Sequence, residues 1–270
     1  MRVQRSGSAQ GSFALHCDVA GAGTETVVLT HGLGSSGATW SALVAALAPR
    51  YRVVTWDMRA HGRSDSPDAP CTVAALGEDL AAVVAAVSDG RPVHVLGHSA
   101  GGVVAMRFAI EHPEAVCSLL LVGTASECNA RAVAYYEALA ETGEREGGAA
   151  ILRRMGTRDP SALEPDGPGY ARVARAMASL HPEPLTPEVH RIVAPTLIIV
   201  GEKDFLGVGG SVIVSRRVAN PRLEIVPERG HAIFLEDPEG FARLVGGFLD
   251  QWKWNGKTRF SPKDGGGGST

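Results

Sequence analysis

One serine in this chain has surroundings that could make it reactive. Ser99 is the central residue of Gly97-His-Ser-Ala-Gly101, which matches the G-x-S-x-G pattern. The apolar run Val93–Gly97 leads into the pattern, and a helix-compatible run beginning at Ala100 follows it. A serine at such a sharp strand-to-helix turn has a strained backbone, and the helix N-terminus favours negative charge beside it. The pattern and its context predict a nucleophilic serine, and the alternative is a chance glycine-rich turn.

A serine hydroxyl is a weak nucleophile unless a base takes its proton, and the base needs an orienting acid. His231 is the predicted base because it lies between the last predicted strand and the last predicted helix. Asp204 is the predicted acid, since it follows a strand that ends at Val200. Glu127 also follows a strand at the same edge of the sheet, and position alone does not decide between the two acids. The order serine, acid, histidine is typical of one large class of hydrolases.

Backbone N–H groups are expected to complete this site. His31-Gly-Leu-Gly34 follows the predicted strand Thr26–Thr30. The N–H groups of Leu33 and Ala100 are therefore predicted to form an oxyanion hole beside Ser99, the feature that often contributes most to the rate. We expect His31 to hold this loop by hydrogen bonding rather than to act as a second base.

Short β-branched runs that alternate with Ala-rich helical stretches must position these residues. The predicted strands are Thr26–Thr30, Arg52–Trp56, Val93–Gly97, Ser118–Val122, Thr196–Val200 and Leu223–Val226. The predicted helices are Trp40–Ala48, Val73–Val87, Ala100–Glu111 and Pro238–Trp252, the last with Asp237 as its N-cap. The strands are nearly continuous apolar runs, which favours a mostly parallel, doubly wound sheet covered on both faces.

A long interval interrupts this alternation. The residues from Ala125 to Ala194 are mainly helical in pattern, and a structureless loop of that length is improbable. We expect a helical cap over residues 125–194 and a core formed by residues 1–124 and 195–252. Residues 253–270 are predicted to be a tail that ends in an engineered linker, because Gly265–Thr270 has the composition of a flexible linker.

Composition excludes several classes of protein. The chain has 270 residues, 44% hydrophobic and 20% charged, with a net charge of −3, so neither a nucleic acid nor an anionic membrane is an expected partner. The first twelve residues lack the apolar core of a secretory signal, and no apolar run is long enough to span a bilayer. The four cysteines form no C-x-x-C pair, which favours free thiols in a cytoplasmic protein. No metal site and no cofactor site is predicted.

Five motifs in the expected order resemble the α/β-hydrolase superfamily, in its cap-bearing serine branch of esterases and lactonases. These motifs are His31-Gly32, Asp57-Met-Arg-Ala-His-Gly-Arg-Ser-Asp65, Gly97-His-Ser-Ala-Gly101, Gly201-Glu-Lys-Asp204 and Gly230-His231. The resemblance covers about Val27 to Leu249 and includes proteins similar to 3-oxoadipate enol-lactonase. It implies the α/β-hydrolase fold, with a helical cap inserted after the sixth strand. It also implies structural roles for Asp57 and Arg59, in a loop where the family usually has glycine and this chain has Ala60.

The resemblance implies an activity as well. The expected reaction is cleavage of a carboxylic ester or lactone of a small molecule through an acyl-enzyme intermediate, without a cofactor or a metal. Other serine chemistry on this fold stays open, namely thioesterase, C–C hydrolase, acyltransferase or perhydrolase activity, as does a non-catalytic ligand-binding role. The partner is expected to be an ester, lactone or thioester, and the oligomeric state is not predicted. The residues predicted to line the pocket are Trp40, His98, Tyr135, Met155 and Phe234.

Overall fold

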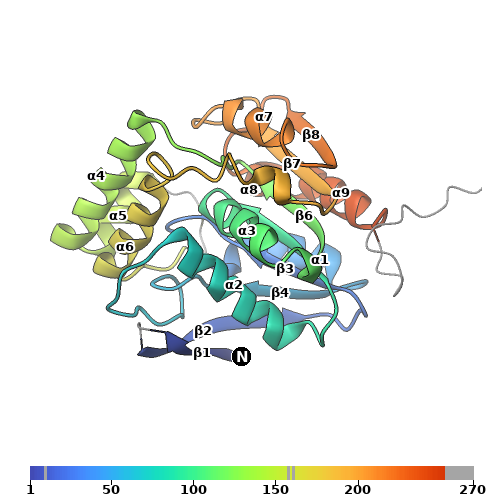
Figure 1. The fold of residues 1–270 in the computed structure, drawn as a ribbon, viewed down its shortest axis with the longest axis horizontal. Coiled ribbons are helices and arrows are strands. Elements are labelled where there is room, and N and C mark those ends of the chain that lie inside the picture. The colour runs from blue at the N-terminus through green and yellow to red at the C-terminus, as the bar shows by residue number, and fades with distance from the viewer. Residues whose placement is uncertain (9–10, 157–158, 160–161, 253–270) are drawn as a thin grey trace, which may run out of the picture.

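A single eight-stranded sheet forms the centre of the molecule in this computed structural model, which describes residues 1–8, 11–156, 159 and 162–252 (Figure 1). The strands are β1 (Arg2–Ser8), β2 (Gly11–Ala20), β3 (Thr26–Thr30), β4 (Arg52–Trp56), β5 (Val93–His98), β6 (Val116–Val122), β7 (Thr196–Gly201) and β8 (Pro221–Val226). Their order across the sheet is β1-β2-β4-β3-β5-β6-β7-β8. β2 runs antiparallel to β1 and β4, and β3 to β8 are parallel to one another. The predicted mostly parallel sheet is therefore confirmed.

The sequence analysis missed β1 and β2, which form the antiparallel edge of the sheet. In β2, Phe13, Leu15 and Cys17 are buried at every second position, and the residues that flank them are more exposed or smaller. An antiparallel strand with one face toward water has only this alternation, without the continuous apolar run of the central strands. The tail beyond Trp252, predicted to end in a linker, lies outside the described residues.

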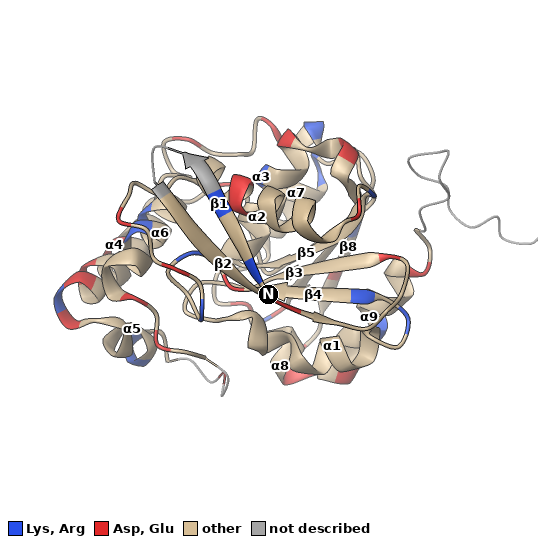
Figure 2. Cartoon of the chain, turned by 90° about the horizontal axis from the view of Figure 1, so that it is seen from below, with Lys and Arg blue, Asp and Glu red and all other residues tan. Residues whose placement is uncertain are grey.

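Helices cover both faces of the sheet, as a doubly wound fold requires. The core helices are α1 (Ser41–Leu47), α2 (Val73–Val87), α3 (Ala100–Glu111), α7 (Gly209–Ser215), α8 (Ile233–Glu236) and α9 (Pro238–Leu249). Short 3-10 helices occur at Gly37–Trp40, Pro113–Ala115 and Val189–Arg191. Figure 2 shows α2, α3 and α7 on one face and α1, α8 and α9 on the other, with acidic and basic residues scattered along the chain.

Predicted and observed helix boundaries agree closely. α2 and α3 begin and end at the predicted residues, and Asp237 caps α9 by accepting the Gly240 N–H at 2.9 Å. The first helix begins at Ser41 rather than Trp40, because Trp40 ends a 3-10 turn. The last helix ends at Leu249 rather than Trp252. Among the described residues, no helix combines the length and apolarity needed to span a membrane.

Three further helices are inserted between β6 and β7 and lie together at one end of the molecule (Figure 1). They are α4 (Ala130–Glu146), α5 (Gly148–Met155) and α6 (Gly167–Ala178). Leu139 of α4 and Tyr170 of α6 are fully buried, so the insertion has its own apolar contacts. An insertion after the sixth strand is the helical cap that the family resemblance implied. The exact domain boundaries at residues 125 and 194 stay a prediction.

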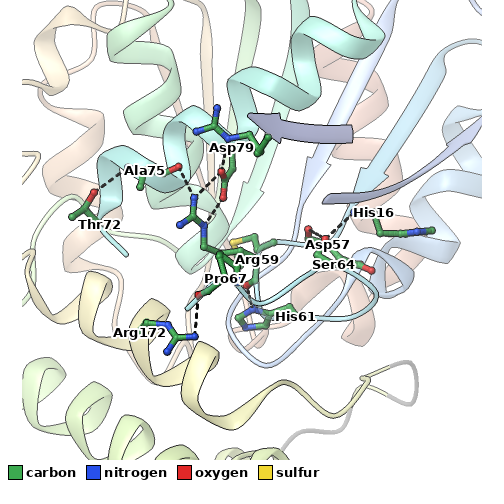
Figure 3. Close-up of polar contacts among 12 residues, drawn as sticks. His16, Asp57, Arg59, His61, Ser64, Pro67, Thr72, Ala75, Asp79 and Arg172 are labelled. Carbon is green, nitrogen blue, oxygen red and sulfur yellow. Dashed lines mark hydrogen bonds and ion pairs between the residues drawn. The ribbon is translucent and has the colours of Figure 1, made fainter. Parts of the chain in front are cut away.

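The loop that follows β4 is held by buried ion pairs and hydrogen bonds (Figure 3). Arg59 donates two hydrogen bonds to Asp79 of α2, at 2.6 and 2.8 Å, and both side chains are buried. Asp57 accepts the N–H groups of Gly37 and Arg63 at 2.7 and 2.8 Å. These contacts agree with the structural role expected for Asp57 and Arg59. Ala60, where the family usually has glycine, has a φ of 62°, a left-handed conformation that costs a residue with a Cβ about 1–2 kcal/mol.

Candidate active site

The turn between β5 and α3 places Ser99 in a strained conformation. Ser99 has φ 52° and ψ −119°, and its N–H donates to the Val122 carbonyl at 2.8 Å. Glycines on both sides make the turn possible. A Cβ on Gly97 would lie 2.2 Å from the Gly101 carbonyl oxygen, and one on Gly101 would lie 2.4 Å from the His31 carbonyl oxygen. Strain of this kind is typical of functional sites, where neighbouring structure holds an otherwise unfavourable backbone.

His231 and Asp204, which are far apart in sequence, are hydrogen bonded. His231 Nδ1 lies 2.8 Å from Asp204 Oδ2, and Asp204 Oδ1 accepts the Leu206 N–H at 2.8 Å. The Asp204 side chain is 1% exposed and that of His231 is 17% exposed, so solvent screens this contact little. Gly123 has a φ of 52°, and a Cβ there would lie 3.0 Å from Asp204 Oδ2 and 3.1 Å from His231 Nδ1. The pair therefore occupies space that only a glycine leaves free.

The alternative acid, Glu127, has a different partner. Its Oε2 accepts the Thr186 hydroxyl at 2.6 Å, which ties the start of the cap insertion to the segment that follows α6. Of the two acids that the sequence left open, the structure brings Asp204 to the histidine.

Two backbone donors lie near Ser99, that of Leu33 in the loop after β3 and that of Ala100 at the start of α3. His31 Nε2 accepts the Met58 N–H at 2.9 Å, and His31 Nδ1 donates to the Gly32 carbonyl at 2.7 Å. Burial lowers the pKa of His31, which agrees with this neutral tautomer. His31 thus holds the loop, as predicted. Within the described residues, the N–H groups of Leu33 and Ala100 have no hydrogen-bond acceptor, so both remain available to a ligand.

Two further side chains contact the His231 loop. His98 Nε2 donates to the His231 carbonyl at 3.1 Å, and the two rings lie 4.7 Å apart. Burial, together with the nearby His231, lowers the pKa of His98 well below its usual range, so this ring is neutral. Phe205 packs edge-on against the His231 ring at 4.7 Å. The sequence analysis missed Phe205, for which the available signal was an aromatic residue directly after the candidate acid.

A cavity of about 360 Å³, which we call the first cavity, lies over Ser99 and His231. Four of the predicted pocket residues line it, namely His98, Tyr135, Met155 and Phe234. Lining residues that were not predicted include Tyr136, Leu139, Asp159, Phe205, Leu206 and Leu235. Trp40 differs from the prediction, because its ring is 0% exposed and does not line the cavity. It packs behind Phe234 at 4.5 Å and His98 at 6.4 Å, and so supports the cavity wall from inside the core.

A second cavity, of about 320 Å³, also reaches Ser99. Tyr136 and Leu206 line both cavities, so the two spaces adjoin at the nucleophile. The other residues that line the second cavity include Gly123, Thr124, Cys128, Ala132, Gly210 and Ile213.

One group of described side chains has the spacing of a metal site, and it lies away from Ser99. Glu78, Glu111 and His112 form this group, which is largely exposed. Glu111 is the last residue of α3, whereas Ser99 precedes the first. A twelve-residue helix spans about 18 Å, so these side chains cannot take part in chemistry at Ser99.

Comparisons with known proteins agree with this fold. A family model described as "Alpha/beta hydrolase family" matches residues 27–244. A putative carbamate hydrolase of Caulobacter is 30% identical over 247 residues, covering 83% of this chain and 90% of that protein. An uncharacterized protein of Mycobacterium tuberculosis is 30% identical over 264 residues, covering 86% and 77%.

Solved structures show the same fold. The enol-lactonase of Burkholderia xenovorans has a TM-score of 0.80 at 24% identity, covering 88% of this chain and 96% of that one. A thermophilic esterase of Thermogutta terrifontis has a TM-score of 0.83 at 24% identity, covering 92% and 98%.

Proposed function

This chain belongs to the alpha/beta hydrolase family and is a hydrolase, and we propose that it cleaves a carboxylic ester or lactone of a small molecule with Ser99 as nucleophile. The observation that carries the proposal is the buried 2.8 Å hydrogen bond between Asp204 and His231, beside a strained serine that lines the same cavity as the histidine. A nucleophile, a base and an orienting acid are the parts that acyl transfer to serine needs.

In the proposed first step, His231 Nε2 takes the proton of the Ser99 hydroxyl as the oxygen attacks the carbonyl carbon. Within the described residues the Ser99 hydroxyl has no hydrogen-bond partner, so its proton is available. Asp204 keeps the other ring proton on Nδ1 and stabilises the imidazolium that forms. The carbonyl oxygen becomes negative, and the free N–H groups of Leu33 and Ala100 stabilise it.

In the second step, the imidazolium of His231 gives its proton to the leaving oxygen, the bond from the carbonyl carbon to that oxygen breaks, and an acyl-Ser99 ester remains. Water then attacks this ester with His231 again as the base, which releases the carboxylic acid and restores Ser99. No step requires a cofactor or a metal.

The same machinery would serve the alternatives that the sequence left open. Thioesters, and ketones cleaved at the adjacent carbon–carbon bond, present a similar carbonyl, and acyl transfer or perhydrolysis differs only in what attacks the acyl-enzyme. Carbamates, named for one relative of this chain, present such a carbonyl as well. An ester or lactone is our first choice because the first cavity is lined mainly by apolar and aromatic side chains. A non-catalytic ligand-binding role is less consistent with the site, since binding alone does not require the buried pair of Asp204 and His231.

Active-site labelling and turnover test this proposal. A fluorophosphonate probe should label the wild type and the control Ser88→Ala, whose serine is the C-cap of α2, but not Ser99→Ala. p-Nitrophenyl acetate should be hydrolysed by the first two proteins and not by the third. Labelling of Ser99→Ala at the wild-type rate, or no ester turnover by the wild type, would contradict the proposal.

A further inference from the structure

Two cavities adjoin at Ser99, and different residues line them. This difference bears on which cavity holds which of the two groups that an ester joins. We infer that the first cavity holds the alcohol arm of an ester and that the second cavity holds its acyl arm. This inference rests on the proposed function and adds to it the residues that select each arm. Because the second cavity is enclosed by residues from the core and the cap together, the acyl specificity would be set where these two parts meet.

The chemistry of the tetrahedral intermediate gives the first step of the argument. Its carbon carries four groups, namely the serine oxygen, the negative oxygen, the leaving oxygen and the acyl carbon. The negative oxygen must face the oxyanion donors, and the leaving oxygen must lie within reach of the protonated histidine. Leu33 and His231 both line the first cavity, and neither lines the second. The leaving oxygen, and with it the alcohol arm of the ester, therefore lies in the first cavity.

The acyl carbon must then point away from His231, and the second cavity provides space in that direction. It contains Ser99 and extends past Gly123 and Thr124 at the end of β6. Its volume of about 320 Å³ is close to the 360 Å³ of the first cavity, so an acyl chain can be accommodated as well as an alcohol.

Small side chains on three elements create the second cavity. Ala132 comes from α4 of the cap, Gly210 from the start of α7, and Val103 from α3. Ile213, also on α7, contributes a larger and partly buried side chain. A larger residue at Ala132 or Ile213 should shorten the space beyond Ser99 without touching the residues of the proposed triad.

A crossed substrate series tests the assignment. The acyl arm is varied with p-nitrophenyl acetate, butyrate and octanoate, and the alcohol arm is varied with ethyl, butyl and octyl acetate followed in a pH-stat. Ala132→Phe and Ile213→Trp fill the second cavity, and Leu235→Trp narrows the first. Arg131→Phe, an exposed change on the same helix as Ala132, is the matched control. The melting temperature of each variant shows whether it folds. Two variants fill the second cavity, so the test can still be made if one of them does not fold.

Ala132→Phe and Ile213→Trp should lower kcat/KM for the octanoate relative to the acetate about tenfold or more. This is the size of effect expected when extra side-chain volume is forced into space that the long acyl chain would fill. They should leave the ratio of octyl to ethyl acetate within about threefold of wild type, since the alcohol arm is unaffected. Leu235→Trp should show the opposite pattern, and Arg131→Phe neither. Second-cavity variants that alter only the alcohol series, or neither series, would overturn the assignment while leaving ester hydrolysis intact. Absence of turnover for every ester, together with absence of Ser99 labelling, would overturn the proposed function itself.

Discussion

Replacing Asp204 by asparagine tests the proposed triad most directly, because the substitution changes charge and hydrogen bonding but almost no volume. In the structure, Asp204 Oδ1 accepts the Leu206 N–H at 2.8 Å, and Oδ2 faces His231 Nδ1 at 2.8 Å. An asparagine would keep its oxygen on the Leu206 N–H and turn its NH₂ group toward the histidine. Nδ1 would then have to accept a hydrogen bond, which places the ring proton on Nε2. That nitrogen could no longer take the proton of Ser99.

The expected cost follows from this change of tautomer and from the loss of a buried negative charge beside the imidazolium. The corresponding substitution in a well-studied serine protease lowers kcat about 10⁴-fold, and we expect a loss of about 10²–10⁴ here. This range corresponds to about 3–5 kcal/mol of transition-state stabilisation. KM should change little, because Asp204 does not line either cavity in the described part of the chain.

The assay is steady-state hydrolysis of p-nitrophenyl acetate, with kcat and KM determined separately. Glu127→Gln is the control, since Glu127 is the other acid at this edge and its partner is the Thr186 hydroxyl. Glutamine can still accept that hydrogen bond, so kcat should stay within about tenfold of wild type. The short acetyl group avoids an effect of Glu127 on the second cavity, which this residue lines. A larger loss of kcat in Glu127→Gln than in Asp204→Asn would refute the reasoning.

Three other perturbations have defined outcomes. Gly123→Ala would place a Cβ 3.1 Å from His231 Nδ1, at a backbone φ of 52°, and would displace the His231 ring. kcat should therefore fall about tenfold, and an unchanged kcat would show that the space at Gly123 is not needed to position His231. Burial lowers the pKa of His61 to about 3 from its ordinary 6.5, so the unfolded chain gains a proton below pH 6.5 that the folded chain does not. The free energy of unfolding, measured in urea, should therefore fall from pH 6.5 to pH 5, with a slope from this group that rises to about 1.4 kcal/mol per pH unit near pH 5, and His61→Phe should remove that share of the slope. Asp79→Asn removes the carboxylate that pairs with the buried Arg59 side chain and should cost about 3–5 kcal/mol of stability in urea unfolding, whereas a cost below 1 kcal/mol would mean that solvent reaches Arg59.

Local features of the chain predicted most of the core. The central strands are continuous apolar runs because both of their faces are buried, and this pattern can be read without tertiary information. The boundaries of α2 and α3 follow from local periodicity and from residues at their ends, such as Thr72, whose side chain accepts the Ala75 N–H at 3.0 Å. The turn at Ser99 was predictable for the same reason, since glycines within two residues of the serine make room for it.

The edge of the sheet and the wall of the cavity could not be predicted in this way. β1 pairs with β2, and β2 pairs with β4, which lies more than 30 residues further along the chain. Trp40 and Phe205 both lie near motifs of the proposed catalytic site in sequence. Trp40 turns into the core, and Phe205 stays 64% exposed against the His231 ring. The direction of a large side chain depends on what already fills the space around it, and that is a property of the packed structure.

The sequence by itself predicted the central parallel strands and placed Ser99 and His231 just beyond strand ends, because each of these features depends on a strand, a turn or a helix that forms from neighbouring residues. Only the tertiary structure decided between Asp204 and Glu127 as the partner of that histidine. Both acids follow parallel strands that end at the same edge, so position alone does not decide between them, and the short turn after Val200 only favoured Asp204 as a prediction. A hydrogen bond, however, forms only within about 3 Å, and the distances between loops at that edge depend on how strands and helices from the whole chain pack together.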